Sequence, residues 1–268
     1  MQSRGTFHQG SLQTPSECDL IPTRCHGQGS PVSLSSPTLS VIIPTLNAAA
    51  VLPVTLAALA GLGENVELVV TDGGSGDGTA AIAQAGGARV IAAPRGRGPQ
   101  LAAGAEAATG RFFLFVHADT RLDDQAIRTI RAFLANAPRN PNSEIRAGYF
   151  LFALDDEAPA ARRLERWVRW RCRWLALPYG DQGLLLSRTL YHAIGGFRPL
   201  PLMEDVDLIR RLGRARLVAL DGKAMTSAER FRRTGYLRRS LRNLTCLALY
   251  GLGVPIERIL RLYDTGEP

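Results

Sequence analysis

The sequence predicts an α/β fold in which a mostly parallel, doubly wound sheet carries helices on its faces. Short apolar runs alternate with stretches of helical apolar spacing from residue 39 onward, and this alternation is typical of parallel strands joined by helices. Polar clusters follow two of the apolar runs, at residues 72–79 and 117–120. Because ligands bind beyond the carboxyl ends of the strands in such sheets, these clusters predict where a functional site lies.

Each predicted strand is a short apolar run closed by a turn residue or a polar cluster, as expected for strands buried on both faces. The four runs are residues 39–44, 66–71, 88–93 and 111–116. Helices are expected between them at residues 47–60, after Thr79 and at residues 99–109.

The chain of 268 residues is long enough to bury a sizeable core. Residues 1–37 are rich in Ser, Pro, Gly, Gln and Thr, and such a composition predicts a disordered tail. We expect the main domain to cover residues 38–225. An amphipathic helical extension is expected to follow at residues 226–268.

The sequence predicts a cytoplasmic protein. No run reaches the roughly 18 apolar residues that a membrane-spanning helix needs, and no basic region precedes an apolar stretch at the N-terminus. The four cysteines lack CxxC spacing and are expected to be reduced thiols. The spacing of Cys18, Cys25 and His26 fits no common metal site.

Charge is distributed unevenly along the chain. Residues 1–157 carry 11 basic and 14 acidic side chains, whereas residues 158–268 carry 21 basic and 10 acidic ones. Such asymmetry indicates a polyanionic surface as partner, either nucleic acid or acidic lipid headgroups. Nucleic acid is disfavoured because no known binding module is present and the first half is acidic.

A predicted helix at residues 162–174 concentrates this positive charge. Trp167, Trp170 and Trp174 share one helical face and are flanked by arginines, a composition typical of helices that lie at the inner face of a membrane. The alternative is a helix that packs its tryptophans on the protein core. A second amphipathic stretch at residues 237–250 favours the membrane interpretation.

The glycine-rich segment 72–79 follows the second predicted strand. It matches neither the dinucleotide-binding pattern GxGxxG nor a Walker loop. Its glycines would let a ligand approach the backbone, with Asp72 facing that ligand. Alternatively the segment is a tight turn in which Asp77 or Thr79 caps the next helix. Both interpretations can hold at once.

Two acidic clusters are candidates for chemistry. Asp119 follows the fourth strand, where a divalent cation could bridge its carboxylate to phosphate oxygens; the alternative is a turn or N-cap residue. Glu204, Asp205 and Asp207 open a predicted helix at residues 206–212. Acidic residues suit the first turn of any helix, but a general base tuned by its neighbours would use the same pattern.

In chain order these segments resemble the family 2 glycosyltransferases of GT-A fold. The resemblance rests on the sequences SVIIPTLN, DGGSGDGT, HADT, GDQG, GGF and ED, which are residues 40–47, 72–79, 117–120, 180–183, 195–197 and 204–205. HADT and PYGDQG are most similar to the rSAM/selenodomain-associated transferase 2 subgroup, which is related to carotenoid-acid glycosyltransferases.

The resemblance implies an inverting sugar transfer from a nucleotide-sugar donor to a hydroxyl or carboxyl acceptor, which could be lipid-linked or carotenoid-like. It implies Asp205 as the catalytic base with Glu204 beside it. It also implies that Asp119 holds Mg²⁺ or Mn²⁺ on the diphosphate. The residues implied to bind the nucleotide sugar are Pro44, Asn47, Asp72, Arg97 and His117, and those on the acceptor side are Asp181 and Gln182.

The sequence departs from the family pattern at two positions. His117 stands where the first Asp of the family's DxD motif is expected, and Ala48 stands where an acid is frequent. These departures favour a catalytically inactive membrane-binding module as one alternative. Another is a nucleotidyltransferase of related topology, although the glycine-rich basic loop it needs near the first strand is absent from residues 44–47.

Overall fold

The computed structural model describes residues 38–136 and 146–264, all within one compact unit. The predicted tail at residues 1–37, with Cys18, Cys25 and His26, lies outside the described residues, as does the end of the predicted C-terminal extension. In the part that is described, no helix is long and apolar enough to cross a membrane.

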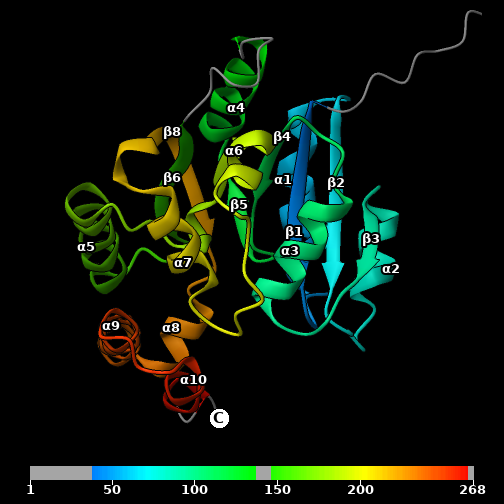
Figure 1. Ribbon diagram of the computed structural model, residues 1–268. Coiled ribbons are helices and arrows are strands. Elements are labelled where there is room, and N and C mark those ends of the chain that lie inside the picture. The colour runs from blue at the N-terminus through cyan, green and yellow to red at the C-terminus, as the bar shows by residue number, and fades with distance from the viewer. Residues whose placement is uncertain (1–37, 137–145, 265–268) are drawn as a thin grey trace, which may run out of the picture. The chain divides into compact units, whose positions relative to one another are not determined.

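A mixed sheet forms the centre of the described chain (Figure 1), with the strand order β3-β2-β1-β4-β7-β6-β8-β5. The strands are β1 (Leu39–Thr45), β2 (Val66–Asp72), β3 (Arg89–Ala92), β4 (Phe112–Phe115), β5 (Thr120–Leu122), β6 (Ala147–Leu154), β7 (Leu184–Ser187) and β8 (Leu217–Thr226). Strands β1 to β4 are parallel, as predicted. Strand β7 is antiparallel to both its neighbours, β4 and β6, so the second half of the sheet is mixed.

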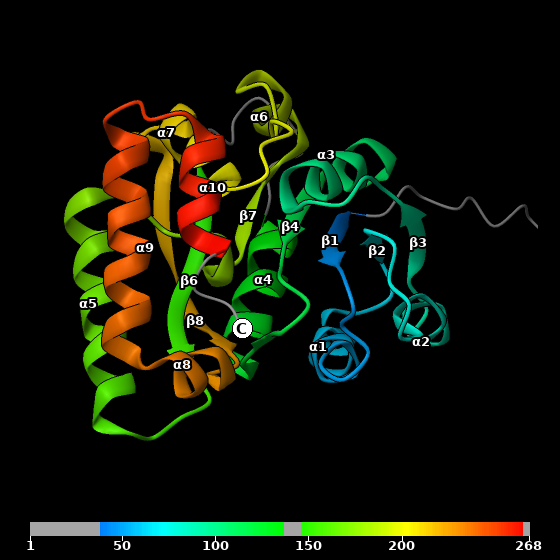
Figure 2. The same cartoon turned by 90° about the horizontal axis from the view of Figure 1, so that it is seen from below.

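Helices cover both faces of the sheet. They are α1 (Leu52–Leu59), α2 (Thr79–Ala85), α3 (Arg97–Ala107), α4 (Asp124–Asn136), α5 (Pro159–Leu175), α6 (Arg188–Ala193), α7 (Glu204–Leu212), α8 (Glu229–Thr234), α9 (Tyr236–Gly251) and α10 (Ile256–Asp264). Short 3₁₀ turns lie at Ala60–Leu62, Gly180–Gln182 and Arg214–Arg216. Figure 2 shows α3 on one face of β1 and β2, with α1 and α2 on the other.

The alternation of side chains along β1 explains why the sheet is covered on both faces. Val41 and Ile43 pack in the cluster that includes α1 and α4, whereas Ile42 packs in the cluster that includes α3 and α7. All seven residues of β1 are buried. A strand that is apolar on both faces needs a helical layer on each side, which is what the continuous apolar run predicts.

Helix α1 begins later than its apolar spacing predicts. Asn47 has a left-handed backbone with φ of 49°, which a helix cannot contain. The helix starts at Leu52, and Pro53 lies in its first turn, where a missing N–H costs no hydrogen bond. Residues 46–51 are therefore a loop at the carboxyl end of β1.

Helices α8 to α10 lie near the carboxyl end of the sheet, toward which the arrow of β2 points in Figure 1. Cys246 of α9 and Ile259 of α10 form a small buried cluster with Leu202, which precedes α7. These helices therefore pack beside the edge where the ligand site is expected. A domain boundary between residues 225 and 226 stays a prediction.

Candidate active site

The loops after β1 and β2 hold one another by hydrogen bonds. The Asn47 amide N–H donates to Ser75 Oγ at 2.8 Å, and the Asn47 side-chain oxygen accepts from the Gly76 amide at 3.0 Å. The Ala48 amide donates to Thr79 Oγ1 at 2.8 Å. Asn47 thus joins two loops at the carboxyl edge of the sheet, and Pro44 is buried just before them in β1.

Asp72 ends β2 and organises the loop that follows it. Its Oδ2 accepts from the amides of Gly74 at 3.1 Å and Ser75 at 2.8 Å, while its Oδ1 accepts from Thr45 Oγ1 at 3.1 Å and from the Ser75 hydroxyl. Burial alone would raise the pKa of this carboxyl, but the hydrogen bonds outweigh it and lower the pKa on balance. Asp72 is therefore held ionised and fixed at the edge of the sheet.

The same loop contains the turn that begins α2. Gly78 occupies the N-cap position with φ of 86°, and no side chain caps the helix there. Asp77 Oδ1 accepts from the Thr79 amide at 3.1 Å, and its Oδ2 accepts from the Ala49 amide at 3.0 Å. Asp77 therefore braces the loop rather than capping the helix from the N-cap position, because glycine occupies that position.

A cavity of about 140 Å³ brings together the residues that the motifs single out on different parts of the chain. It is lined by Arg97 at the start of α3, His117 and Asp119 after β4, Asp181 in the 3₁₀ turn, and Asp205 in the first turn of α7. Asp119 accepts no hydrogen bond and forms no ion pair within the described chain. Three carboxylates and one imidazole therefore face a common space.

Asp205 is fixed by backbone amides. Its Oδ2 accepts from the Gly180 amide at 2.8 Å and its Oδ1 from the Val206 amide at 2.7 Å. Because Asp205 lines the cavity while its carboxylate is held by donors, it can accept a proton from a hydroxyl placed there.

Glu204 lies behind Asp205 rather than beside it in the cavity. Its side chain is completely buried, and its Oε1 lies 3.0 Å from Arg97 Nε, an ion pair without hydrogen-bond geometry. Burial and, to a smaller extent, Asp205 raise the pKa of Glu204 to about 7 against the lowering by Arg97. Glu204 in turn raises the pKa of Arg97. We therefore assign Glu204 to positioning Arg97, which itself reaches the cavity.

The residue before Glu204 has an unusual backbone. Met203 occupies the N-cap position of α7 with φ of 63°, a left-handed conformation that L residues rarely adopt. Its side chain packs beside the buried cluster of Leu202, Cys246 and Ile259. The turn that carries the acidic pair is therefore joined directly to α9 and α10.

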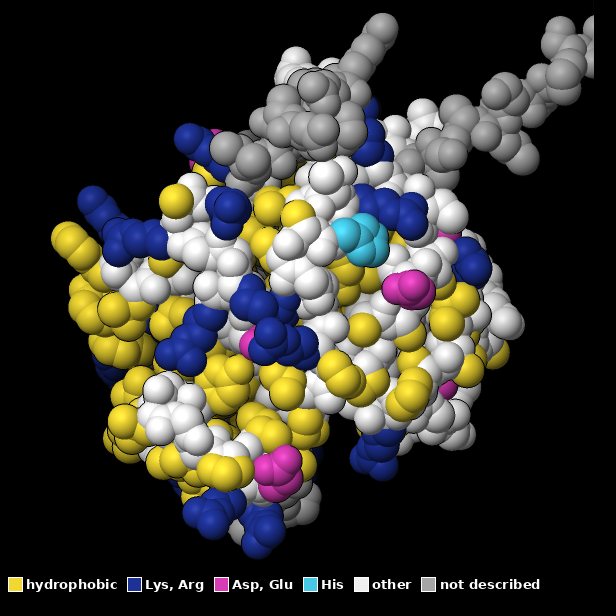
Figure 3. Space-filling view, viewed as in Figure 1, with side chains coloured by type: hydrophobic (Ala, Val, Ile, Leu, Met, Phe, Trp, Pro, Cys, Tyr) yellow, Lys and Arg dark blue, Asp and Glu magenta, His cyan; other side chains and the backbone are white. Residues whose placement is uncertain are grey.

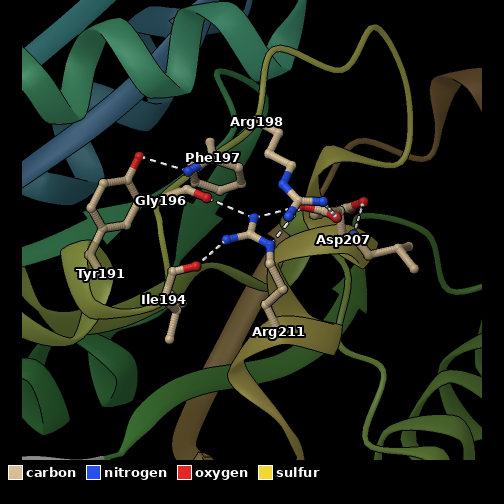
Figure 4. A network of polar contacts seen from close by, with 9 residues as sticks. Tyr191, Ile194, Gly196, Phe197, Arg198, Asp207 and Arg211 are labelled. Atoms are coloured by element: carbon tan, nitrogen blue, oxygen red, sulfur yellow. Dashed lines mark hydrogen bonds and ion pairs between the residues drawn. The ribbon is translucent and has the colours of Figure 1, made fainter.

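Asp207 has a different role from Asp205, because it contacts the arginines Arg198 and Arg211 (Figure 4). Its Oδ2 accepts from Arg211 Nε at 2.9 Å, and its Oδ1 accepts from Arg198 Nη1 at 3.2 Å. Arg211 also donates to the carbonyl oxygens of Ile194 and Gly196. Asp207 is therefore engaged in holding the loop before α7 and is not available to a ligand.

Gly196 is required in that loop. Its φ is 58°, and a Cβ atom there would lie 2.8 Å from Tyr191 Cζ. The Phe197 amide donates to Tyr191 Oη at 2.9 Å, which fixes the ring against the loop. The Gly-Gly-Phe motif thus serves the packing of α6 on the loop that leads to α7.

His117 is kept neutral by its surroundings. Burial and, to a smaller extent, Arg97 lower its pKa to about 4 against the opposing effects of Asp119 and Asp205. A Cβ atom at Gly180 would lie 2.7 Å from His117 Nε2, so only glycine fits against the ring. The neutral imidazole retains a lone pair that can accept a proton or bind a metal.

A divalent cation fits this donor set only if the substrate supplies further ligands. No group of three or more His, Cys, Asp or Glu side chains among the described residues forms a metal site. Mg²⁺, however, is commonly held by one or two carboxylates together with substrate phosphates. Asp119 meets that requirement because its carboxylate has no other partner, and Asp181 Oδ1 is buried nearby without a hydrogen bond.

Gln182 is engaged inside the protein. Its Nε2 donates to the Phe150 carbonyl at 2.9 Å, and its Oε1 accepts from the Tyr179 amide at 3.2 Å and from Cys172 Sγ at 3.2 Å. It is almost fully buried. Gln182 can therefore affect acceptor binding only indirectly, by holding the loop at residues 179–182. Asp181, by contrast, lines the cavity directly.

Comparison with known proteins gives a family match for part of the chain. The model for glycosyl transferase family 2 matches residues 40–147, which include β1 to β4 and the loops that carry Asp72 and Asp119. The chain is a glycosyltransferase, and this segment is similar to family 2. A search of curated proteins gives no match.

Solved glycosyltransferases share the fold. One is glucosyl-3-phosphoglycerate synthase from Mycobacterium tuberculosis, in complex with Mn²⁺, UDP and glucosyl-3-phosphoglycerate; at 20% identity the match covers 82% of this chain and 81% of that one, with a TM-score of 0.51. Another is a mannosyltransferase from Pyrobaculum calidifontis in complex with GDP-Man and Mn²⁺. At 17% identity the match covers 80% of this chain and 62% of that one, with a TM-score of 0.53. The glycosyltransferase therefore has the predicted GT-A fold.

Several residues that line the cavity were missed by the sequence analysis. Tyr179 lies beneath the guanidinium of Arg171, whose central carbon is 3.4 Å from the ring centroid. Arg230 of α8 and Asn243 of α9 line the cavity from the C-terminal helices. Tyr179 adjoins the sequence GDQG and could have been included with it. The helical residues belong to no motif, so no signal in the sequence marks them.

Proposed function

We propose that this glycosyltransferase moves a sugar from a nucleotide-sugar donor to a hydroxyl or carboxyl acceptor with inversion at the anomeric carbon. The observation that carries the proposal is Asp205, held by two amides on the wall of a cavity that Asp119 also lines. A base on one side of the sugar and a diphosphate site on the other suit a single in-line displacement.

In this step the acceptor oxygen forms a bond to the anomeric carbon, and its proton passes to Asp205. The bond from the anomeric carbon to the diphosphate oxygen breaks, and its electron pair leaves with the nucleoside diphosphate. Asp72, Asn47 and Pro44 would contact the nucleotide at the edge of β1 and β2. Arg97, positioned by Glu204, and His117 would face the diphosphate.

A divalent cation held by Asp119 would neutralise charge on the leaving diphosphate. The two related structures named above contain Mn²⁺ with a nucleotide or a nucleotide sugar, and a third contains Mg²⁺ with UDP. We propose Mn²⁺ or Mg²⁺ for this chain on the strength of those complexes and of the free Asp119 carboxylate.

The test is a panel of nucleotide sugars, with and without Mn²⁺ or Mg²⁺, scored for nucleoside diphosphate release. A product whose anomeric configuration is inverted supports the single displacement. Retention of configuration would contradict it. Release of pyrophosphate instead of nucleoside diphosphate would favour the nucleotidyltransferase alternative, and no release with any donor would favour the inactive module.

We further propose that the enzyme works at the inner face of the cell membrane through α5. Trp167, Trp170 and Trp174 have exposed fractions of 45%, 45% and 57%, so they do not fill the core. The opposite face of α5 packs on the sheet through Ala161, Val168 and Cys172. Figure 3 shows apolar and arginine side chains together over this part of the surface. Rings and cations so arranged suit an anionic lipid surface.

A lipid-linked or carotenoid-like acceptor, and membership in the rSAM-associated subgroup, belong to the same proposal. They are supported by the HADT and PYGDQG segments and by this exposed surface.

A further inference from the structure

Helices α5 and α9 run side by side (Figure 2) and leave an apolar groove between them. The groove has a volume of about 460 Å³, within the range of about 300–1,000 Å³ usual for small-molecule sites. Its walls include Leu164 and Trp167 of α5 and Leu237, Leu241 and Leu244 of α9. The three leucines of α9 are between 48% and 73% exposed.

The groove is connected to the catalytic cavity. A narrower cavity of about 50 Å³ lies between them. It shares Leu164, Trp167, Ser240 and Leu244 with the groove. It shares Tyr179, Asp181, Phe231 and Asn243 with the catalytic cavity. The three cavities therefore follow one another from the surface between α5 and α9 to the carboxylate of Asp205, with an apolar lining at the groove and polar side chains where the cavities meet.

Polar atoms without partners gather where this path meets the catalytic cavity. Asp181 Oδ1 and Asn243 Oδ1 are both buried, and neither has a hydrogen-bond partner within the described chain. Both are acceptors. A buried acceptor is costly unless a donor reaches it, so this junction suits a ligand group that donates a hydrogen bond. A hydroxyl can donate such a hydrogen bond, whereas an ionised carboxylate cannot.

We propose that the groove between α5 and α9 binds the apolar chain of the sugar acceptor, an alcohol with one extended hydrocarbon chain. The chain lies along the groove, and the hydroxyl passes the narrow cavity to reach Asp205. This inference rests on the proposed function and narrows the acceptor from a hydroxyl or carboxyl to an aliphatic alcohol.

Intrinsic fluorescence tests the groove without any turnover. The chain has three tryptophans, all in α5, so tryptophan emission reports on this helix alone. Bromoundecanol, whose bromine quenches tryptophan, should quench the emission saturably. Bromoundecanoate should bind about tenfold more weakly, because its carboxylate cannot donate a hydrogen bond to Asp181 or Asn243. A tenfold change corresponds to the cost of one unsatisfied polar contact.

Ser240→Phe fills the path, because Ser240 lines both the groove and the narrow cavity. It should weaken bromoundecanol binding about tenfold, the equivalent of two buried methylene groups. Thr245→Phe on the exposed side of α9 is the matched control and should bind as the wild type does. Binding of UDP or GDP with Mn²⁺ should be the same in all three proteins, which shows that the variants fold.

Turnover with butanol, octanol and dodecanol then tests the role of the chain. The KM should fall by up to about fourfold for each added methylene. Quenching that is absent, or unchanged in Ser240→Phe, overturns the inference, as does a dimer in sedimentation that covers the groove. Nucleoside diphosphate release with a KM independent of chain length would support the proposed function and contradict acceptor binding in the groove. Saturable quenching without nucleoside diphosphate release from any donor would support alcohol binding in the groove and contradict the proposed function.

Discussion

The loops proposed to bind the nucleotide and the surface proposed to bind the acceptor are built differently. Around β1 and β2, Asn47, Asp72 and Asp77 bind neighbouring backbone amides, so those loops are fixed before any ligand arrives. On the other side α5 and α9 present exposed tryptophans and leucines. Fixed polar loops suit a constant group such as a diphosphate, whereas an apolar surface gains free energy only when a partner covers it.

Replacing the catalytic base should have the largest effect. In Asp205→Asn the amide keeps the size of the carboxylate but cannot take the acceptor proton, so turnover should fall by about 10²–10⁴-fold. Donor binding should change little. Turnover is measured as nucleoside diphosphate release, and donor affinity by calorimetry. Activity within a few-fold of wild type would show that another residue is the general base.

Asp207→Asn should act on stability instead. Removing this charge leaves Arg211, whose side chain is 19% exposed, without its ion-pair partner; breaking such a buried pair typically costs about 3–5 kcal/mol. Urea unfolding gives the free energy. The control is Arg198→Gln, because Arg198 is 60% exposed and its loss should cost about 1 kcal/mol or less. Equal losses of stability in the two variants would contradict the ion pair with Arg211 as the main contact of Asp207 (Figure 4).

Asp119→Ala should weaken Mn²⁺-dependent binding of a nucleoside diphosphate by about 10–100-fold, since even changes around a metal ligand cost that much. Without the metal the variant should bind the nucleoside diphosphate at least as tightly as wild type does, because a bare carboxylate repels the diphosphate. Calorimetry with and without Mn²⁺ separates the two. Asp124→Asn, at the exposed start of α4, is the control. Unchanged affinity would remove Asp119 from the site.

The membrane effect should be the smallest. Each arginine near anionic lipid contributes about 1 kcal/mol and salt screens it, so binding should be reversible and should weaken as salt is added. The double variant Trp167→Ala, Trp170→Ala should bind anionic liposomes several-fold more weakly than wild type. Co-sedimentation with anionic and neutral liposomes measures this. Equal binding to both lipids would contradict the contribution of the arginines, and unchanged binding by the double variant would mean that the exposed rings of α5 have another partner.

The contrast between the two sides also explains what the sequence could predict. Strands β1 to β4, and the positions of Asp72 and Asp119, follow from short apolar runs that end in polar residues. Asp205 was instead marked by the acidic start of a predicted helix. The antiparallel direction of β7 could not be predicted, because a buried strand has the same apolar sequence pattern in either direction. The buried state of Glu204 was missed because its partner Arg97 lies far away in sequence. Tyr179, Arg230 and Asn243 reach the cavity through packing of α8 and α9, which no local pattern encodes.

The left-handed backbone at Met203 has a mechanical consequence. On one side the chain continues into Glu204 and Asp205, and on the other Leu202 is packed against Cys246 of α9 and Ile259 of α10. A conformation that costs of order 1 kcal/mol or more persists only while the packing around it holds it in place. We therefore expect a shift of the C-terminal helices to move this turn, so that filling the proposed acceptor side would also displace the carboxylate of Asp205.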